Sequence, residues 1–213
     1  MSNIFESSEF DSWAQSYDTD VAESDDKGLF PFAGYKKLIH VLYNKISKKA
    51  SSRVLDIGIG TGILSSALYK NGHCITGTDY SVDMLKIAQE KMPDAELIQW
   101  DFMEDIPDCI KSRKFDFIIS TYALHHITDD EKLRLISDLL MLLGNDGVLL
   151  IGDIGFANLE EMKKCKETFN DEWDNEFYFV LSEFKTHLHC LLEYQQLSHC
   201  CVLLELKPGE TKK

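Results

Sequence analysis

The sequence predicts an α/β fold: a doubly wound, mostly parallel sheet of seven strands with an N-terminal helical lid. Two observations lead to this prediction. Short apolar runs alternate along the chain with segments of helical periodicity, an order typical of a parallel sheet covered by helices on both faces. In addition, three glycines at alternate positions in "DIGIGTG" (56–62) stand where the first strand would turn into a helix.

The first half of the sheet can be placed from these patterns. A helix is expected at 34–46, where apolar side chains share one helical face: Tyr35, Leu38, Ile39, Leu42 and Ile46. Four strands are then expected at 53–57, 73–79, 95–100 and 115–121. One helix between them is expected at 62–71, and another begins after the N-cap residue Ser81 and ends before Pro93.

The second half begins with a helix whose start is marked by "TDDE" at 128–131. Thr128 and Glu131 predict a capping box, and Gly144 is expected to end this helix. The apolar run "GVLLIGD" predicts a strand that is buried on both faces. The elements expected here are that strand at 147–153, helices near 158–170 and 178–187, and closing strands at 189–196 and 199–206.

The charge balance restricts the partners that we expect. Lys and Arg number 22 against 36 Asp and Glu, which gives a formal net charge of -14. Such a field repels polyanions, so we expect neither nucleic acid nor an anionic membrane as a partner. The sequence shows no secretory leader, no apolar stretch of the ~20 residues that a membrane span needs, and no CxxC pair of cysteines. We therefore expect a cytoplasmic protein, either a monomer or a homodimer.

The glycine-rich turn predicts a ligand site, the alternative being a tight strand–helix turn with no ligand. Glycine lets a ligand approach the backbone, and the following helix offers unpaired N–H groups. Acidic residues at the ends of the next two strands, Asp79 and Asp101, favour a ligand. Asp79 can bind ribose hydroxyls, and Asp101 with the ring of Phe102 can hold an adenine. The sequence thus predicts an adenosine derivative.

The residues around the glycines decide between two adenosine cofactors. A dinucleotide turn requires a small residue where this chain has Ile63, and a register shifted by two places puts Ser65 there. Asp56 precedes the glycines and would be badly placed beside a pyrophosphate. The same negative charge suits a ligand that bears an ammonium and a sulfonium group, and S-adenosylmethionine (SAM) carries both.

These motifs resemble those of a known family. "VLDIGIGTG" is similar to the first motif of the class I, Rossmann-like SAM-dependent methyltransferases, with "GTDYS" and "WDF" in the places of the following motifs. "FDFIISTYALHHI" is similar to the segment that lines the methyl site in small-molecule methyltransferases. "FDSWAQSYD" resembles a helix that folds over the cofactor. Within the class, the chain looks most like the small bacterial YrrT-type methyltransferases.

The resemblance implies one domain over residues 1–213 and SAM as the cofactor. It divides the chain into a lid segment (1–50), a cofactor-binding core (51–155) and C-terminal helices and strands (156–213). In this reading Asp56 orients the ammonium group, Asp79 binds the ribose, and Tyr17 reaches the methionyl carboxylate from the lid. The other cofactor contacts that the resemblance implies are Gly58, Gly60, Tyr80, Met84, Asp101, Phe102 and Thr121.

Methyl transfer from a sulfonium is an in-line displacement, so it needs alignment first and a general base only where the acceptor must lose a proton. His125 and His126 follow the fourth strand and are the candidates for this base. Alternatively, one of them only anchors the loop before the next helix. No metal is expected, because the histidines and cysteines between His187 and Cys201 lack the spacing of a common zinc site.

Three functions follow from these observations. The one that we expect is a SAM-dependent methyltransferase acting on a small-molecule acceptor. The second is a SAM-binding protein without turnover, which senses the cofactor or binds a partner. The third is an NAD-type oxidoreductase, which the glycine register and the lack of a second substrate domain disfavour.

Overall fold

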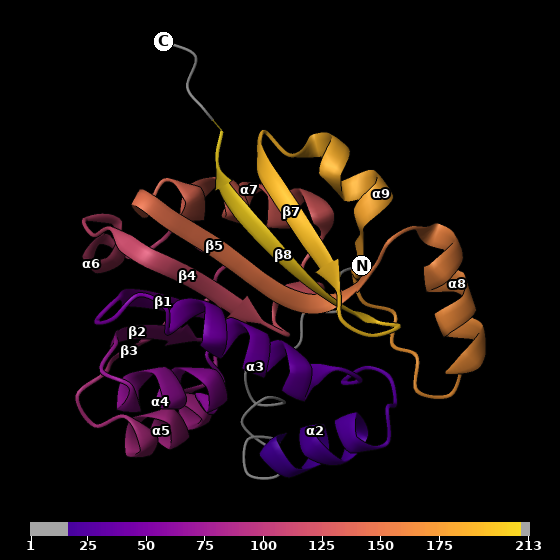
Figure 1. The fold of residues 1–213 in the computed structure, drawn as a ribbon, viewed down its shortest axis with the longest axis horizontal. Coiled ribbons are helices and arrows are strands. Elements are labelled where there is room, and N and C mark those ends of the chain that lie inside the picture. Colours follow the sequence, from indigo (N-terminus) through magenta and orange to yellow (C-terminus); the bar gives the residue numbers. More distant parts are fainter. Residues whose placement is uncertain (1–16, 210–213) are drawn as a thin grey trace.

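The computed structural model describes residues 17–209, apart from the side chains of Tyr17 and Asp20 (Figure 1). The helices are α2 (Tyr17–Asp26), α3 (Tyr35–Ile46), α4 (Ile63–Lys70), α5 (Val82–Lys91), α6 (Asp108–Lys111), α7 (Asp129–Leu140), α8 (Leu159–Thr168) and α9 (Leu181–Phe184). The strands are β1 (Arg53–Ile57), β2 (Cys74–Asp79), β3 (Glu96–Gln99), β4 (Phe115–Thr121), β5 (Leu143–Phe156), β6 (Phe179–Val180), β7 (Cys190–Gln196) and β8 (Cys201–Pro208). Two 3-10 turns, η1 (Leu124–His126) and η2 (Lys185–His187), complete the described elements.

The strands form one sheet in the order β3-β2-β1-β4-β5-β8-β7. The first five of these strands pair in parallel, whereas β8 runs antiparallel to β5 and to β7. This order confirms the predicted doubly wound, mostly parallel sheet. An additional strand, β6, pairs with the end of β5 where the sequence predicted only a helix. Two residues are too short to give a periodic signal, so the pattern missed it.

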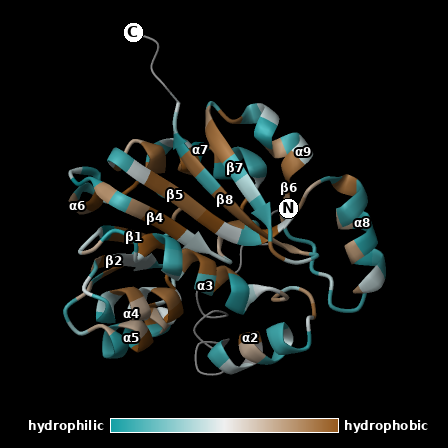
Figure 2. Cartoon of the chain, in the orientation of Figure 1, coloured by the Kyte–Doolittle hydropathy of each residue, from teal (hydrophilic) through white to brown (hydrophobic). Residues whose placement is uncertain are grey.

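Helices cover both faces of the sheet and build an apolar core on each (Figures 1 and 2). On one face, α3 and α4 pack through residues such as Leu42 and Leu68. On the other face, α7 packs through residues such as Leu139. Neighbouring side chains of β5 point to opposite faces, so they alternate between the two cores. Leu150, for example, belongs to the first core and Leu149 to the second. The continuous apolar run that predicted a doubly buried strand therefore fills both layers.

The predicted end of α7 is wrong, and β5 begins earlier than expected. Helix α7 ends at Leu140, and Gly144 lies inside the strand, two residues into β5. Leu143 already pairs with Phe115, and the register then shifts along the strand. The polar stretch at 144–146 interrupts the apolar pattern, which is why the sequence placed the start of this strand at 147.

Helix α3 belongs to the packed core of the molecule. Leu38 lies against the backbone of Gly152 in β5, where an added Cβ would come within 2.4 Å of the leucine side chain. The start of α3 is stabilised by a residue of α2, because the carboxylate of Asp25 accepts hydrogen bonds from the backbone N–H groups of Gly34 (2.7 Å) and Lys36 (2.9 Å). A lid could therefore involve only the segment before α3.

The aromatic residues before α3 pack against the C-terminal part of the chain. Phe30 is buried, and its ring stacks on Trp173 at a centroid distance of 5.0 Å and meets the edge of Tyr178 at 5.7 Å. Phe32 lies beside Tyr122 at 5.2 Å. Three further aromatic residues of the expected lid segment, Phe5, Phe10 and Trp13, lie outside the described residues.

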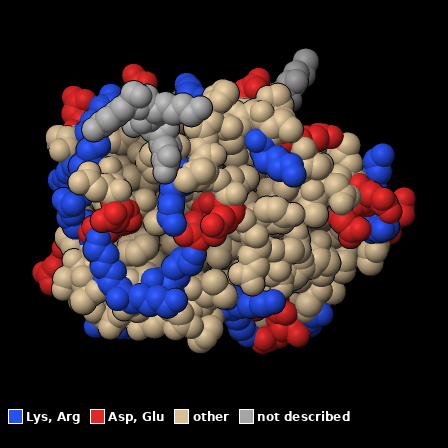
Figure 3. All heavy atoms as spheres, turned by 45° about the horizontal axis from the view of Figure 1, so that its top comes forward, with Lys and Arg blue, Asp and Glu red and all other residues tan. Residues whose placement is uncertain are grey.

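Acidic and basic side chains are interspersed on the face drawn in Figure 3. Several form ion pairs there or elsewhere, such as Lys91 with Asp18 at 3.0 Å and Lys49 with Asp116 at 2.7 Å. Within residues 17–209, no helix is both long enough and apolar enough to cross a bilayer.

Candidate active site

The three glycines after β1 all have positive φ angles, of 69° at Gly58, 55° at Gly60 and 75° at Gly62, yet for different reasons. A Cβ at Gly58 would lie 2.6 Å from that of Ala123, in the segment after β4. A Cβ at Gly62 would lie 2.9 Å from the end of Met92, next to α5. A Cβ at Gly60 would meet nothing within 4 Å. Two glycines thus allow close packing, whereas Gly60 faces open space that a ligand can fill.

Asp79, at the end of β2, is joined directly to this turn. One carboxylate oxygen accepts the N–H of Gly60 at 2.7 Å, and the other accepts the N–H of Ser81 at 2.9 Å. Ser81 also caps α5, as predicted, by accepting the N–H of Met84. Each carboxylate oxygen can accept a second hydrogen bond, so ribose hydroxyls can share Asp79 with the backbone.

Asp56, the fourth residue of β1, is buried and only half paired. Its Oδ2 accepts the hydroxyl of Ser65 at 2.6 Å, whereas its Oδ1 has no hydrogen-bond partner. Burial raises the pKa of Asp56 to about 7, against the lowering effect of Ser65 and with a small further rise from Asp79. A buried acceptor without a donor is unfavourable unless a ligand supplies one. A ligand with an ammonium group could supply that donor.

Asp101 and Phe102 follow β3 at the same rim. The N–H of Trp100 donates to the carbonyl of Asp79 at 3.0 Å, which places the end of β3 beside the end of β2. The Oδ1 of Asp101 accepts the N–H of Met103 at 2.8 Å, so the carboxylate also stabilises its own turn. Phe102 is partly buried against the second apolar core.

The other predicted cofactor contacts differ in exposure. Tyr80 keeps 37% of its surface exposed, so its ring is accessible to a ligand. Met84 is buried, with 3% exposed, which leaves only a small part of it for the adenine. Thr121 ends β4 and pairs with Gly152 of β5, on the rim that also carries Asp79.

Helix α2 is tied to the glycine turn through Asp18. Its Oδ1 accepts the hydroxyl of Thr61 at 2.5 Å, and its Oδ2 accepts the Nζ of Lys91 at 3.0 Å. One carboxylate on the N-terminal helix therefore bridges the turn after β1 and the end of α5. The side chain of Tyr17, one residue earlier, lies outside the described residues.

The two candidate catalytic histidines lie together in η1, with ring centroids 4.1 Å apart. The Nδ1 of His125 is hydrogen-bonded to Asp153 at 2.6 Å, and the Nδ1 of His126 to Glu176 at 2.8 Å. Burial lowers the pKa of His125, but the adjacent Asp153 outweighs it and the net shift is upward. Burial and the neighbouring His125 lower the pKa of His126.

Sequence reasoning missed both carboxylates and a buried lysine behind them. Asp153 stands in an apolar run of β5, and this isolated charge is a signal that could have identified it. Glu176 is fifty positions from His126, and nothing in its neighbourhood marks it. Lys132 is fully buried, and its Nζ donates to Asp129 at 2.8 Å and to the carbonyl of Phe177. These contacts hold the segment that carries Glu176 beside η1.

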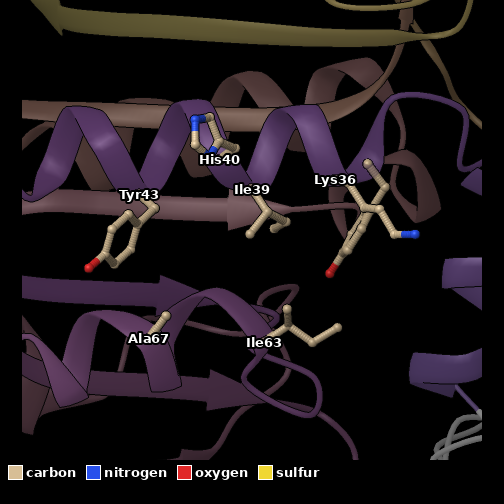
Figure 4. A pocket seen from close by; sticks show the side chains of 7 residues that line it. Lys36, Ile39, His40, Tyr43, Ile63 and Ala67 are labelled. Atoms are coloured by element: carbon tan, nitrogen blue, oxygen red, sulfur yellow. The ribbon is translucent and has the colours of Figure 1, made fainter.

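A groove with a volume of about 320 Å³ lies elsewhere, between α3 and α4 (Figure 4). It is lined by Tyr35, Lys36, Ile39, His40, Tyr43, Ile63 and Ala67. None of the predicted cofactor residues is among them. The glycine turn and the acids at the ends of β1, β2 and β3 meet instead at the carboxyl ends of the strands, which is where ligands bind in open α/β sheets.

A sheet of this order, with a glycine turn after β1 and acids at the ends of the next strands, defines the class I, Rossmann-like methyltransferases. The "Methyltransferase domain" family model matches residues 54–147. An uncharacterized methyltransferase of Bacillus cytotoxicus is 37% identical over 161 residues, which cover 75% of this chain and 72% of the relative. One of Bacillus cereus is 32% identical over 189 residues, covering 88% and 84%. The chain belongs to this family of SAM-dependent methyltransferases.

Solved structures show the same fold at low sequence identity. The complex of DhpI with SAH has a TM-score of 0.71 at 17% identity and covers 96% of this chain and 95% of its own. The magnesium protoporphyrin IX methyltransferase of Synechocystis PCC 6803 has a TM-score of 0.67 at 16% identity, covering 96% and 100%. The similarity extends over almost the entire chain, so the described fold is that of the class.

Proposed function

We propose that this methyltransferase transfers a methyl group from SAM to a small-molecule acceptor. The carrying observation is the half-paired Asp56 beside a turn in which Gly60 faces open space and is joined to Asp79. In this arrangement Asp56 would pair with the ammonium group of SAM, and the exposed backbone at Gly60 would face its methionyl part. Asp79 would bind the ribose. A pyrophosphate would place its charge beside Asp56, which argues against the NAD-type alternative.

SAM supplies an electrophilic methyl group on its sulfonium. The chain's own residues would bind and orient it, with Tyr80, Met84, Asp101 and Phe102 around the adenine, Gly58 toward the methionyl part and Thr121 toward the methyl group. Tyr17 would complete the site from the lid. Alignment of the reacting atoms at roughly 3–3.5 Å accounts for much of the rate that such enzymes achieve.

His125 and His126 belong to the acceptor side in this proposal. They follow β4 within a few residues, and Asp153 ties His125 to β5, the strand that pairs with Thr121. Either ring could take the proton of an acceptor that must lose one. His125 is buried and His126 is half-buried, each beside a carboxylate, which is an environment typical of catalytic acids and bases.

The proposal of a small acceptor rests on two features. Helix α2 is bound through Asp18 to the turn that would hold the cofactor, so a polymer would have to pass beneath it. The formal net charge of -14 further disfavours a nucleic acid or an anionic membrane. We also propose a single domain over residues 1–213 and a cytoplasmic monomer or homodimer.

A screen of small metabolites with purified protein and SAM tests this function. The readout is release of S-adenosylhomocysteine (SAH) that depends on both the protein and one metabolite. Release with a small molecule and none with RNA, DNA or protein supports the proposal. Methylation of a protein alone, or binding of SAM with no turnover on any acceptor class, would contradict it.

A further inference from the structure

The histidine pair and Glu176 have the composition of a metal site as well as of a hydrogen-bond network. Within residues 17–209, His125, His126 and Glu176 are the group of ligating side chains close enough to hold an ion, with one ligand atom of each within 4.8 Å of the others. Oε2 of Glu176 lies 3.6 Å from Nε2 of His125, and Oε1 lies 2.8 Å from Nδ1 of His126, in a hydrogen bond that an ion would replace. Ligands of a tetrahedral zinc ion lie roughly 3.3–3.6 Å apart, given bonds of 2.0–2.2 Å.

The ring of His125 is held in one orientation by a carboxylate, as a ligating histidine is in many metal sites. Its Nδ1 faces Asp153 at 2.6 Å, and Asp153 itself accepts the N–H groups of Leu124 (2.8 Å) and Ile154 (2.7 Å). With a proton on Nδ1 shared with this carboxylate, Nε2 turns its lone pair toward Glu176. A carboxylate that orients a ligating histidine in this way is the usual outer partner of zinc.

The local charge favours a cation. Asp153, Asp174 and Glu176 act electrostatically on the histidines, and the ammonium of Lys132 opposes them at His125. Lys132 is already compensated, since its Nζ bonds Asp129 and lies 4.9 Å from the centre of the Phe179 ring. The acidic surplus around two imidazoles is therefore available to a second cation.

We propose that His125, His126 and Glu176 bind one divalent transition-metal ion, with Zn²⁺ or Co²⁺ preferred over Mg²⁺ or Ca²⁺. Imidazole nitrogens with a single carboxylate suit zinc-like ions, whereas magnesium and calcium prefer oxygen ligands. Three protein ligands leave a fourth position open, as in catalytic rather than structural zinc sites. This proposal departs from the sequence-based expectation of no metal, which rested on the lack of zinc-site spacing between His187 and Cys201 and on a methyl transfer that needs no ion.

The ion would also determine which chemical class of acceptor is methylated. This part of the inference rests on the proposed methyl transfer. A metal and a proton compete for the same ring nitrogens, so a loaded histidine pair cannot serve as the base. An acceptor hydroxyl or thiol at the open position would instead have its pKa lowered and would release its proton to solvent. Its lone pair would form the new bond to the methyl carbon, and the electron pair of the broken C–S bond would stay on SAH.

The test uses the full chain after dialysis against a chelator, titrated with Co²⁺ and read by its visible ligand-field absorption. We expect one Co²⁺ per chain, displaced by Zn²⁺. Glu176→Gln and His126→Asn should weaken binding by more than the roughly 10–100-fold that loss of an outer partner costs. His187→Asn, an exposed histidine outside the cluster, is the matched control and should bind as the wild type does.

Thermal melts without metal identify any variant that fails to fold, and His126→Asn and Glu176→Gln serve as backups for each other. Absence of saturable Co²⁺ binding, wild-type affinity in a folded Glu176→Gln protein, or equal loss in His187→Asn would overturn the metal site. SAH binding to the metal-free chain, measured by calorimetry, separates the two proposals. SAH binding without Co²⁺ binding refutes the metal site alone, and Co²⁺ binding without SAH binding refutes the methyl-transfer assignment alone.

Discussion

The backbone N–H of Gly60 donates to the carboxylate of Asp79 at 2.7 Å. This hydrogen bond joins the turn after β1 to the end of β2 within the protein itself. The carboxylate that the sequence assigned to the ribose is thus also the group that shapes the turn. A substitution at Asp79 should therefore affect cofactor binding through both the lost ribose contacts and a less ordered turn.

Asp79→Ala should lower the affinity for SAH at least about tenfold, because hydrogen bonds to a charged acceptor contribute ~1.5–3 kcal/mol each. Calorimetry gives this affinity. Asp83→Ala, which removes a partly exposed acid in the first turn of α5, is the matched control and should change the affinity little. Wild-type affinity in Asp79→Ala would remove Asp79 from the cofactor site.

Gly60→Ala should weaken SAH binding at least about tenfold while costing only the ~1–2 kcal/mol of stability expected for a left-handed alanine. Gly72 provides the comparison, since it also has a positive φ, of 86°, and open space around an added Cβ. Gly72→Ala should lose similar stability and bind SAH normally. Denaturant titration and calorimetry measure the two effects, and equal affinities in the two variants would refute the assignment of Gly60.

Asp56 should make both stability and cofactor binding depend on pH. Its folded-state pKa of about 7 lies above the ordinary value of 3.8, so between these values the folded chain holds a proton that the unfolded chain has lost. The free energy of unfolding should therefore fall as pH rises through this window. SAH affinity should rise over the same range, since an ammonium group favours the ionised carboxylate.

Denaturant titrations and calorimetry at about pH 5 and about pH 7 measure these two trends. Asp56→Asn cannot ionise, so its stability should depend less on pH and its SAH affinity should be lower at neutral pH. The prediction fails if the wild type and Asp56→Asn show the same pH dependence of both quantities.

Asp18→Ala should release α2 from the turn, because it removes the bonds to Thr61 and Lys91. Limited proteolysis should then cut residues 17–26 faster, and SAH should protect this segment less than in the wild type. Asp26→Ala is the control, since Asp26 pairs with Lys36 at the other end of α2. Equal cleavage of the wild type with and without SAH would instead indicate a helix that stays docked and does not act as a lid.

Much of the fold could be predicted because its signals are local. The strand ends at Ile57, Asp79 and Thr121 agree with the expected bounds, and the Thr128 capping box is present. The start of β5 was missed because a register shift, set by pairing with Phe115, lets polar residues continue a strand.

The candidate site was less accessible to sequence reasoning where it depends on distant partners. The glycine turn after β1 is marked by a short local motif, so its residues could be predicted from the sequence. Nothing near His126 indicates that Glu176 will lie beside it. That contact depends on Lys132 holding the carbonyl of Phe177, and on β6 pairing with β5, which are long-range events.

Strand β5 is hydrogen-bonded to β4 on one side and β8 on the other, and β6 extends the pairing at its end. Backbone amides in such a strand exchange with deuterium only when the sheet opens, so we expect them to report global unfolding. Asp153 belongs to this strand, so its hydrogen bond with His125 should persist through local fluctuations that leave the sheet closed. We therefore expect the proposed acceptor side to be anchored in slowly exchanging backbone, and α2, which holds the turn by side-chain contacts, to open more readily.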